Sequence, residues 1–218
     1  MKALLPILIL ISGDGSNLQA IIEATRTDLA VAIRAVISNR RDAYGIERAK
    51  QAGIPTYIIP HDNYPSRIKF EAVLQKIIDY YHPKLIVLAG FMRKLSEDFV
   101  AYFPGRMINI HPSLLPKYAA NLNTHECVLA TGDREHGVSI HYVTKDIDKG
   151  PLICQASLLV TKRDTPKTLS QRIHTLEHIL YPQVLSWFSA GRLALRNQQV
   201  WLDNKLLPRT GKEIFYVY

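Results

Sequence analysis

The chain has 218 residues, of which 47% are hydrophobic and 21% are charged. This composition excludes a disordered or fibrous protein, and the length allows a substantial folded core. Two cysteines are too few for a disulfide framework, so we expect a reducing, cytoplasmic location. The net charge of +8 raises a nucleic-acid hypothesis, but Lys and Arg are scattered along the chain. We therefore expect a solvated basic surface that favours small anions.

The first apolar run, PILILIS (6–12), could belong to a signal peptide or to a buried strand. A Lys precedes it, but no A-x-A cleavage pattern follows, and the chain passes directly into SGDGSN (12–17). A buried parallel strand has the same apolar texture. We predict a strand here, and no later run reaches the ~20 apolar residues of a membrane span.

The first half of the sequence alternates strand-like and helix-like patterns. The predicted strands are 6–12, 30–38, 55–60, 84–90 and 106–110, and the predicted helices are about 17–26, 43–52 and 66–82. In the last helix, Ile68, Val73, Ile77 and Ile78 form an apolar stripe at helical spacing. The alternation predicts an α/β fold with a Rossmann-like, mostly parallel sheet and helices on both faces.

The second half is less regular. Residues 138–143 and 152–160 are predicted strands, 166–190 is a predicted long helix ended by Gly191, and LALRN and VWLD form a predicted hairpin. Composition shows no break along the chain, which favours a single domain. We place this domain at residues 1–208 and treat residues 209–218 as a C-terminal tail without an interpretable pattern.

Polar segments that follow predicted strands are candidate sites, because ligands of open α/β sheets bind beyond the carboxyl ends of the strands. In SGDGSN, the glycines allow positive φ, and the following helix start could hold a phosphate. A tight turn capped by Ser16 or Asn17 explains the same pattern. Asp14 disfavours an anion unless its side chain points away. The segment LAGFMRKL (88–95) is ambiguous, since it could simply begin a helix.

The end of the 106–110 strand leads into NIHPSLLP. Asn109 and His111 are two residues apart and share one face of the strand, and prolines then end the strand and stiffen the loop. An amide donor beside an imidazole suits a reaction that develops an oxyanion and moves a proton. Asp148, in the turn-rich DIDKGP, could stabilise the charged histidine. A structural role for each of these residues is the alternative.

Other chemistries have weaker support. His136 and His141, and His174 and His178, are possible metal ligands, but the helical pair lacks the Glu of H-E-x-x-H and a third carboxylate. Ser113 is not in a G-x-S-x-G elbow, and the cysteines have no telling context. We therefore expect neither a metal nor a covalent intermediate.

Six motifs occur in order along the chain: ISGDGSNLQAII, LAGFMRKLS, NIHPSLLPKY, EHGVSIHYV, DIDKGPLICQ and TLEHILYP. Together they resemble the phosphoribosylglycinamide formyltransferase family over residues 4–208. NIHPSLLP marks the wider group of formyltetrahydrofolate enzymes, and the glycine-serine-asparagine loop and the LEH segment narrow it to this family.

The resemblance implies a reaction in de novo purine biosynthesis. The amine of glycinamide ribonucleotide attacks the formyl carbon of the cosubstrate 10-formyltetrahydrofolate, and tetrahydrofolate leaves. Asn109, His111 and Asp148 match the family's catalytic trio. The resemblance also implies small-molecule partners, no nucleic acid, no membrane, no metal and a monomer or weak homodimer.

The resemblance also assigns binding residues. Gly15, Ser16 and Asn17 match the phosphate-binding stretch, and Glu177 matches a carboxylate near the glycinamide end. The residues that match the folate side are Arg67, Met92, Arg93, Lys94 and Leu95, with Asn109 touching both ligands.

The sequence departs from the family in two places. AANLN follows LLPKY where the family usually has Pro-Gly and then a histidine, and Asp14 stands where the family often has Asn. Three alternatives therefore stay open. They are a formyltetrahydrofolate hydrolase, a formyltransferase acting on charged tRNA, for whose extra domain the chain has no room, and a catalytically weakened binding protein.

Overall fold

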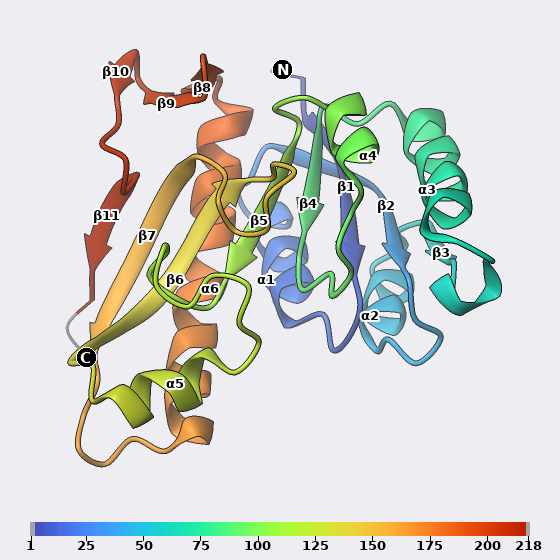
Figure 1. Ribbon diagram of the computed structural model, residues 1–218. Helices are drawn as coiled ribbons and strands as arrows, with labels where there is room; N and C mark the ends of the chain where they lie inside the picture. Colours follow the sequence, from blue (N-terminus) through green and yellow to red (C-terminus); the bar gives the residue numbers. More distant parts are fainter. Residues whose placement is uncertain (1–2, 217–218) are drawn as a thin grey trace.

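The computed structural model describes residues 3–216, which form an α/β fold around an eight-stranded sheet (Figure 1). The strand order is β11-β7-β6-β5-β4-β1-β2-β3. The strands are β1 (Leu5–Ile11), β2 (Val31–Ser38), β3 (Thr56–Ile58), β4 (Leu85–Leu88), β5 (Met107–His111), β6 (Glu135–Tyr142), β7 (Leu152–Leu159) and β11 (Lys212–Phe215). Among the described strands of this sheet, β6 alone runs antiparallel to its neighbours. The predicted mostly parallel sheet is confirmed.

Helices cover both faces of this sheet. They are α1 (Ser16–Thr25), α2 (Gly45–Gln51), α3 (Arg67–Tyr81), α4 (Glu97–Tyr102), α5 (Thr124–Thr131) and α6 (Pro166–Ser189), with a short 3-10 helix η1 (His61–Asn63). Successive residues of β1 point to opposite faces, so that Ile7 and Ile9 join the core under α1 and α6, whereas Leu8 and Leu10 join the core under α3 and α4. The apolar run predicted as a buried strand therefore fills two cores.

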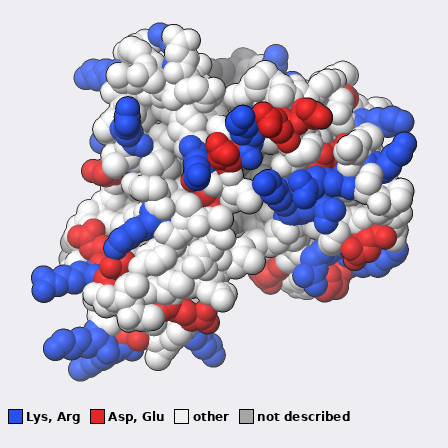
Figure 2. Space-filling view, viewed as in Figure 1, with Lys and Arg blue, Asp and Glu red and all other residues white. Residues whose placement is uncertain are grey.

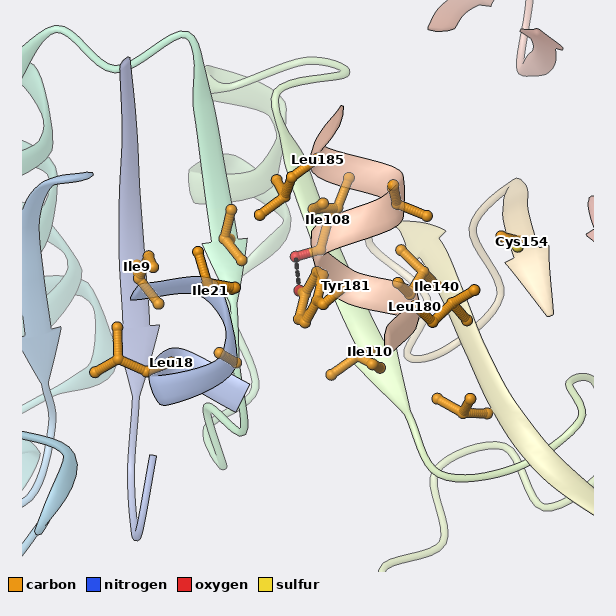
Figure 3. Packing of buried hydrophobic residues seen from close by; sticks show 14 of the residues in the cluster. Ile9, Leu18, Ile21, Ile108, Ile110, Ile140, Cys154, Leu180, Tyr181 and Leu185 are labelled. Carbon is orange, nitrogen blue, oxygen red and sulfur yellow. Dashed lines mark hydrogen bonds between the residues drawn. The ribbon is translucent and has the colours of Figure 1, made fainter. Parts of the chain in front are cut away.

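The long helix α6 fixes the position of the strands that carry the candidate site. A capping box between Thr165 and Thr168 begins it, with Pro166 in its first turn. Fully buried Tyr181 donates from its hydroxyl to the carbonyl oxygens of Leu88 (2.8 Å) and Ile108 (3.5 Å; Figure 3). Burial raises the pKa of Tyr181, so the hydroxyl keeps its proton.

The apolar stripe predicted for α3 is buried in part, since Ile78 lies in the core and Val73 and Ile77 pack against it. Ile68 is 72% exposed, whereas Phe70, Glu71 and Leu74 are buried together with Ile78. Glu71 occupies a core position because its carboxylate accepts from the backbone N–H of Ser96 (2.7 Å) and from the Ser96 hydroxyl. A charged residue thus takes a position on the buried face that the apolar spacing does not predict.

The C-terminal part forms a second, three-stranded sheet from β8 (Leu193–Arg196), β9 (Gln199–Leu202) and β10 (Lys205–Leu206). The predicted hairpin is confirmed by the antiparallel pairing of β8 with β9. The chain then returns to the main sheet, where β11 pairs in parallel with β7. The predicted domain end at residue 208 therefore precedes a strand of the main sheet.

Charged side chains are spread over the surface, as the scattered positions of Lys and Arg in the sequence predict. Figure 2 shows basic side chains on several separate parts of one face, with acidic side chains between many of them. Over residues 3–216, no helix is both long and apolar enough to cross a membrane.

Candidate active site

The carboxyl end of β5 carries the side chains at the centre of the site. Asn109 and His111 lie on the same side of the strand, and the loop after β6 brings Asp148 to both of them. An oxygen of the Asp148 carboxylate lies 3.3 Å from Nδ1 of His111, and the other lies 3.5 Å from the amide nitrogen of Asn109. His111 is only 7% exposed. The three residues predicted as a trio therefore meet.

Both ring nitrogens of His111 face acceptors. Nδ1 faces the Asp148 carboxylate, and Nε2 lies 3.0 Å from the backbone carbonyl oxygen of Tyr118. A neutral imidazole has one N–H and can satisfy only one of these acceptors, whereas an imidazolium donates to both. The geometry therefore favours the charged form of His111.

Asp148 remains ionised in this half-buried setting. Burial is the largest single effect on its carboxyl group and opposes the charge, but the hydrogen bond with His141, the charge of His111 and the backbone N–H of Ala120 (2.9 Å) outweigh it. The pKa of Asp148 is consequently lowered. Its backbone has φ +53°, so the tip of the loop turns tightly to present the carboxylate.

His141 is a fourth member of the cluster, which the sequence analysis weighed only as a metal ligand. The antiparallel pairing of β5 with β6 places it opposite Asn109. Its Nδ1 lies 2.9 Å from the carbonyl of Tyr142, and its Nε2 lies 3.3 Å from the Asn109 amide nitrogen and 3.5 Å from Asp148. The register of this single antiparallel strand could have revealed His141, but neither strand direction nor register was predicted.

The loop after β1 forms one end of the site. Gly15 has φ +78°, and a Cβ at this position would lie 2.6 Å from the Cα of Gly45, so the two backbones approach more closely than any side chain allows. Ser16 and Asn17 then begin α1. Asp14 pairs with Arg48 (3.0 Å), whose guanidinium also donates to the Asp14 carbonyl. This pairing draws the Asp14 charge away from the helix start.

Glu177 of α6 lies beside this helix start. It is 4% exposed, and one of its oxygens accepts from both the Asn17 amide and Nδ1 of His174, at 2.9 Å each. The hydrogen bond to Glu177 is the main cause that raises the pKa of His174. The Asn17 Oδ1 is buried and has no partner among the described residues, which leaves an acceptor available to a ligand.

A cavity of about 350 Å³ is lined in part by His111. Its lining includes Met92, Arg93, Lys94, Leu95, Asn109, His111, Leu122 and Asp148. Arg67, also predicted for the folate side, is the exposed first residue of α3 and is not part of this lining. The predicted residues 92–95 thus lie together, in the same lining as Asn109 and His111.

Ser12 connects the two halves of the site, and the sequence analysis did not assign it a role. Its hydroxyl accepts from the backbone N–H of Met92 (2.7 Å) and donates to Asn39 (2.5 Å). The segment 90–95 is therefore an irregular loop fixed to the end of β1, and the helix considered there does not form; the next helix begins at Glu97.

The histidine pairs considered as metal ligands form other contacts. His174 stacks on His178, and His136 lies 2.9 Å from the ring of His125. Burial, followed by the charge of His125, lowers the pKa of His136 to about 3. Between residues 3 and 216, no group of three or more His, Cys, Asp or Glu side chains is placed to hold a metal.

Residues 5–185 match the formyl transferase family. The chain is 49% identical to phosphoribosylglycinamide formyltransferase of Escherichia coli strain K12 over 206 residues, which cover 94% of this chain and 97% of the relative. The chain belongs to the formyl transferase family. The same enzyme of Haemophilus influenzae is 41% identical over the same share of both chains.

Solved structures of family members agree with this assignment. The phosphoribosylglycinamide formyltransferase of Coxiella burnetii, determined in complex with CHES, superposes with a TM-score of 0.94. It is 66% identical, and the match covers 96% of this chain and 99% of that one. The family recognised from the six motifs is therefore confirmed.

Proposed function

We propose that the chain transfers the formyl group of 10-formyltetrahydrofolate to the amine of glycinamide ribonucleotide. The products are formylglycinamide ribonucleotide and tetrahydrofolate, in de novo purine biosynthesis. One observation carries the proposal beyond the family match. An amide donor and an imidazole with two acceptors line a cavity suited to a flat, partly apolar ligand.

The reaction needs negative charge stabilised on the formyl oxygen. Attack by the amine nitrogen forms a C–N bond and places the carbonyl electron pair on oxygen. We assign the Asn109 amide and the charged His111 to this oxyanion, because preorganised donors in a buried site commonly contribute ~10²–10³-fold each. Collapse of the intermediate then breaks the bond to N10 of the folate.

Asp148 has two tasks in this scheme. Its lowered pKa keeps it ionised, so that it holds His111 in the charged form. It also helps to organise water that carries a proton from the attacking amine to the departing N10, which balances the exchange. His111 already donates toward Asp148 and Tyr118, so the oxyanion competes for one of these hydrogens as it forms.

The ribonucleotide fits the end of the site near α1. The free N–H groups from Gly15 to Asn17 suit the phosphate, because the start of a helix combines such donors with the positive end of the helix dipole. The neutralising contact between Arg48 and Asp14 supports this assignment despite the acidic residue. Glu177 and the unpartnered Oδ1 of Asn17 suit hydroxyl or amine donors of the substrate.

The folate cosubstrate fits the 350 Å³ cavity. Apolar side chains such as Met92 and Leu122 offer contact area for a ring system, and Nε of Arg93 is buried with no partner among the described residues. An orphaned donor in the wall of a cavity is costly unless a ligand or water accepts from it. We therefore assign residues 92–95 to the folate and leave the role of Arg67 as a prediction.

The setting of the enzyme is also a proposal. Cys127 and Cys154 are both free, which fits a reducing cytoplasm. A monomer or weak homodimer acting on two small molecules, without nucleic acid, stays our prediction.

One assay separates the competing functions. Formyltetrahydrofolate is supplied with and without glycinamide ribonucleotide, and the release of tetrahydrofolate is followed. We expect release that depends on the ribonucleotide. Release without it would support a hydrolase, and no release in either case would support a weakened binding protein. Formylation of a charged tRNA in its place would support the nucleic-acid alternative.

A further inference from the structure

The loop of residues 112–123, which joins β5 to α5, touches the catalytic histidine through its backbone. The carbonyl of Tyr118 accepts from Nε2 of His111 at 3.0 Å. Tyr118 and Ala120 both have φ +58°, a left-handed conformation that non-glycine residues adopt at a cost of ~1–3 kcal/mol each. Other contacts must hold this strained turn in place.

One group of contacts fixes the beginning of the loop. The buried Ser139 hydroxyl accepts from the backbone N–H of Leu115 (3.0 Å) and donates to the carbonyl of Ser113 (2.6 Å), and Gln155 donates to the carbonyl of Leu115 (3.0 Å). These bonds end before Tyr118. They orient the loop as it leaves β5 but do not determine the direction of the Tyr118 carbonyl.

A second group of contacts holds Tyr118 itself, through Asp133. The Tyr118 hydroxyl donates to Asp133 at 2.8 Å and lies 2.7 Å from the Thr131 hydroxyl. Lys117, the residue before Tyr118, places its ammonium 2.7 Å from both carboxylate oxygens of Asp133. The hydrogen bonds from Lys117 and Tyr118 lower the pKa of Asp133, so the acceptor is ionised at neutral pH.

We propose that Asp133 is a positioning residue for formyl transfer. It binds the side chains of Lys117 and Tyr118 and thereby keeps the strained Tyr118 carbonyl directed at Nε2 of His111, opposite Asp148. The proposal rests on the function proposed above. Asp133 lies just after α5, outside the lining of the 350 Å³ cavity, and acts through the loop that carries Tyr118.

The other groups around His111 do not replace this contact. On β6, His136 stays neutral because burial lowers its pKa to about 3, and His141 faces Asn109 and Asp148. On the loop after β6, the Asp148 carboxylate faces Nδ1 of His111. The acceptor for Nε2 therefore comes from Tyr118. Its carbonyl also accepts from the backbone N–H of Asn121 (3.2 Å), and its side chain is anchored by Asp133.

The experiment compares Asp133→Ala and Tyr118→Phe with the wild-type enzyme. We expect each variant to lower kcat about 5- to 20-fold while the KM values for both substrates change less than twofold. We also expect the alkaline limb of the kcat–pH profile to move to lower pH, because the charged His111 loses an acceptor. Tyr118→Phe keeps the Asp133 charge, so a matching effect excludes a long-range electrostatic cause.

Three further variants sharpen the result. Asp133→Asn keeps an oxygen that accepts from Tyr118, and we expect it to recover most of the lost kcat. The double variant of Asp133→Ala and Tyr118→Phe should lose no more than the larger single loss, because both act through one contact. Asp203→Ala removes a similar surface pair with Arg192 (2.6 Å) and should leave kcat unchanged.

Unchanged kcat and pH profile in both single variants would overturn the proposal, whether or not the melting temperature falls. Additive losses in the double variant would overturn it as well. If the wild-type chain does not transfer formyl groups at all, the proposed function fails and not the role of Asp133. A crystal structure of Asp133→Ala then decides, since the Tyr118 carbonyl should no longer lie within hydrogen-bond distance of Nε2 of His111.

Discussion

Two loops flank His111, and they are held in different ways. The loop after β1 is fixed by its backbone, since Gly15 packs directly on Gly45, whose N–H donates to the carbonyl of Gly13 (3.1 Å). The loop of residues 112–123 is fixed by side chains, through Ser139, Gln155 and Asp133. The first loop uses glycine at its positive φ, whereas the second places Tyr118 and Ala120 there.

This difference has a physical consequence. A glycine loop adopts its conformation with little strain, and its fixed N–H groups suit a ligand that presents the same phosphate in every turnover. A loop held by side chains stores strain that surrounding contacts must offset, and it can be adjusted one contact at a time. Of the two departures expected from the resemblance, AANLN falls in the second loop, where such adjustment is possible, and Asp14 falls in the first.

The largest expected change in kcat comes from the catalytic residues themselves, and it tests whether the two loops surround one catalytic centre. His111→Ala and Asp148→Ala should each lower kcat by at least ~100-fold, because each removes a group that stabilises developing charge or moves a proton. Steady-state kinetics with both substrates measures this. Near-normal turnover in either variant would mean that the loops converge on a residue without a catalytic role.

Gly15→Ala tests the backbone-held loop. The added Cβ would lie 2.6 Å from the Cα of Gly45 at φ +78°, so we expect a loss of ~2–4 kcal/mol in the free energy of unfolding from strain and overpacking. We also expect the KM for the ribonucleotide to rise at least about tenfold, while the KM for the folate changes little.

Gly53→Ala is the matched control for this variant. Gly53 has φ +69° but no atom within 4 Å of an added Cβ, so it reports the conformational cost without the clash. Chemical denaturation of both variants should show a clearly smaller loss for Gly53→Ala, on the order of 1 kcal/mol. Equal losses would show that close packing does not hold the first loop.

Ser139→Ala tests the side-chain-held loop. The buried Ser139 hydroxyl forms hydrogen bonds with Leu115, Ser113 and Gln155. Removing it should therefore lower the free energy of unfolding by ~1–3 kcal/mol. We expect the effect on kcat to exceed any effect on the KM for the ribonucleotide. Ser189→Ala, whose hydroxyl bonds the Ser186 carbonyl within α6, is the control and should cost less than ~0.5 kcal/mol.

The smallest expected effect concerns pH. The folded state lowers the pKa of Asp148, so this carboxylate adds stability above its unfolded value of about 3.9, and that stability is lost as pH falls through the lowered folded pKa. The difference in unfolding free energy between wild type and Asp148→Asn should therefore shrink between pH 7 and pH 3. A difference that widens toward pH 3 would contradict this sign.

Much of the fold could be predicted because its signals are local. The apolar run of β1 and the capping and periodicity of α6 lie within short stretches of sequence. The short helices α4 and α5 carry little periodicity and were not predicted, whereas α2, with seven residues, was predicted because it lies between two strand-like runs. The place of Glu71 on the buried face of α3 was not predicted, because its carboxylate is satisfied by Ser96, a residue 25 positions away.

The residues of the site likewise divide into those with local sequence signals, which were predicted, and those without, which were missed. Asn109 and His111 were identified because two positions on one strand share a face, and Asp148 and Glu177 because motifs match a known family. His141, Ser12 and Asp133 could not be found by these routes. Each acquires its role from strand register or from a loop conformation that the sequence does not encode locally.

The return of the chain to the main sheet has a consequence for solubility. Without β11 (Lys212–Phe215), one side of β7 would present its unpaired backbone N–H and C=O groups as a free edge, which is a template for pairing with another molecule. A protein shortened at residue 208 would keep every residue assigned to catalysis. It would nevertheless be prone to aggregate through β7, so the final strand protects an active site to which it contributes no side chain.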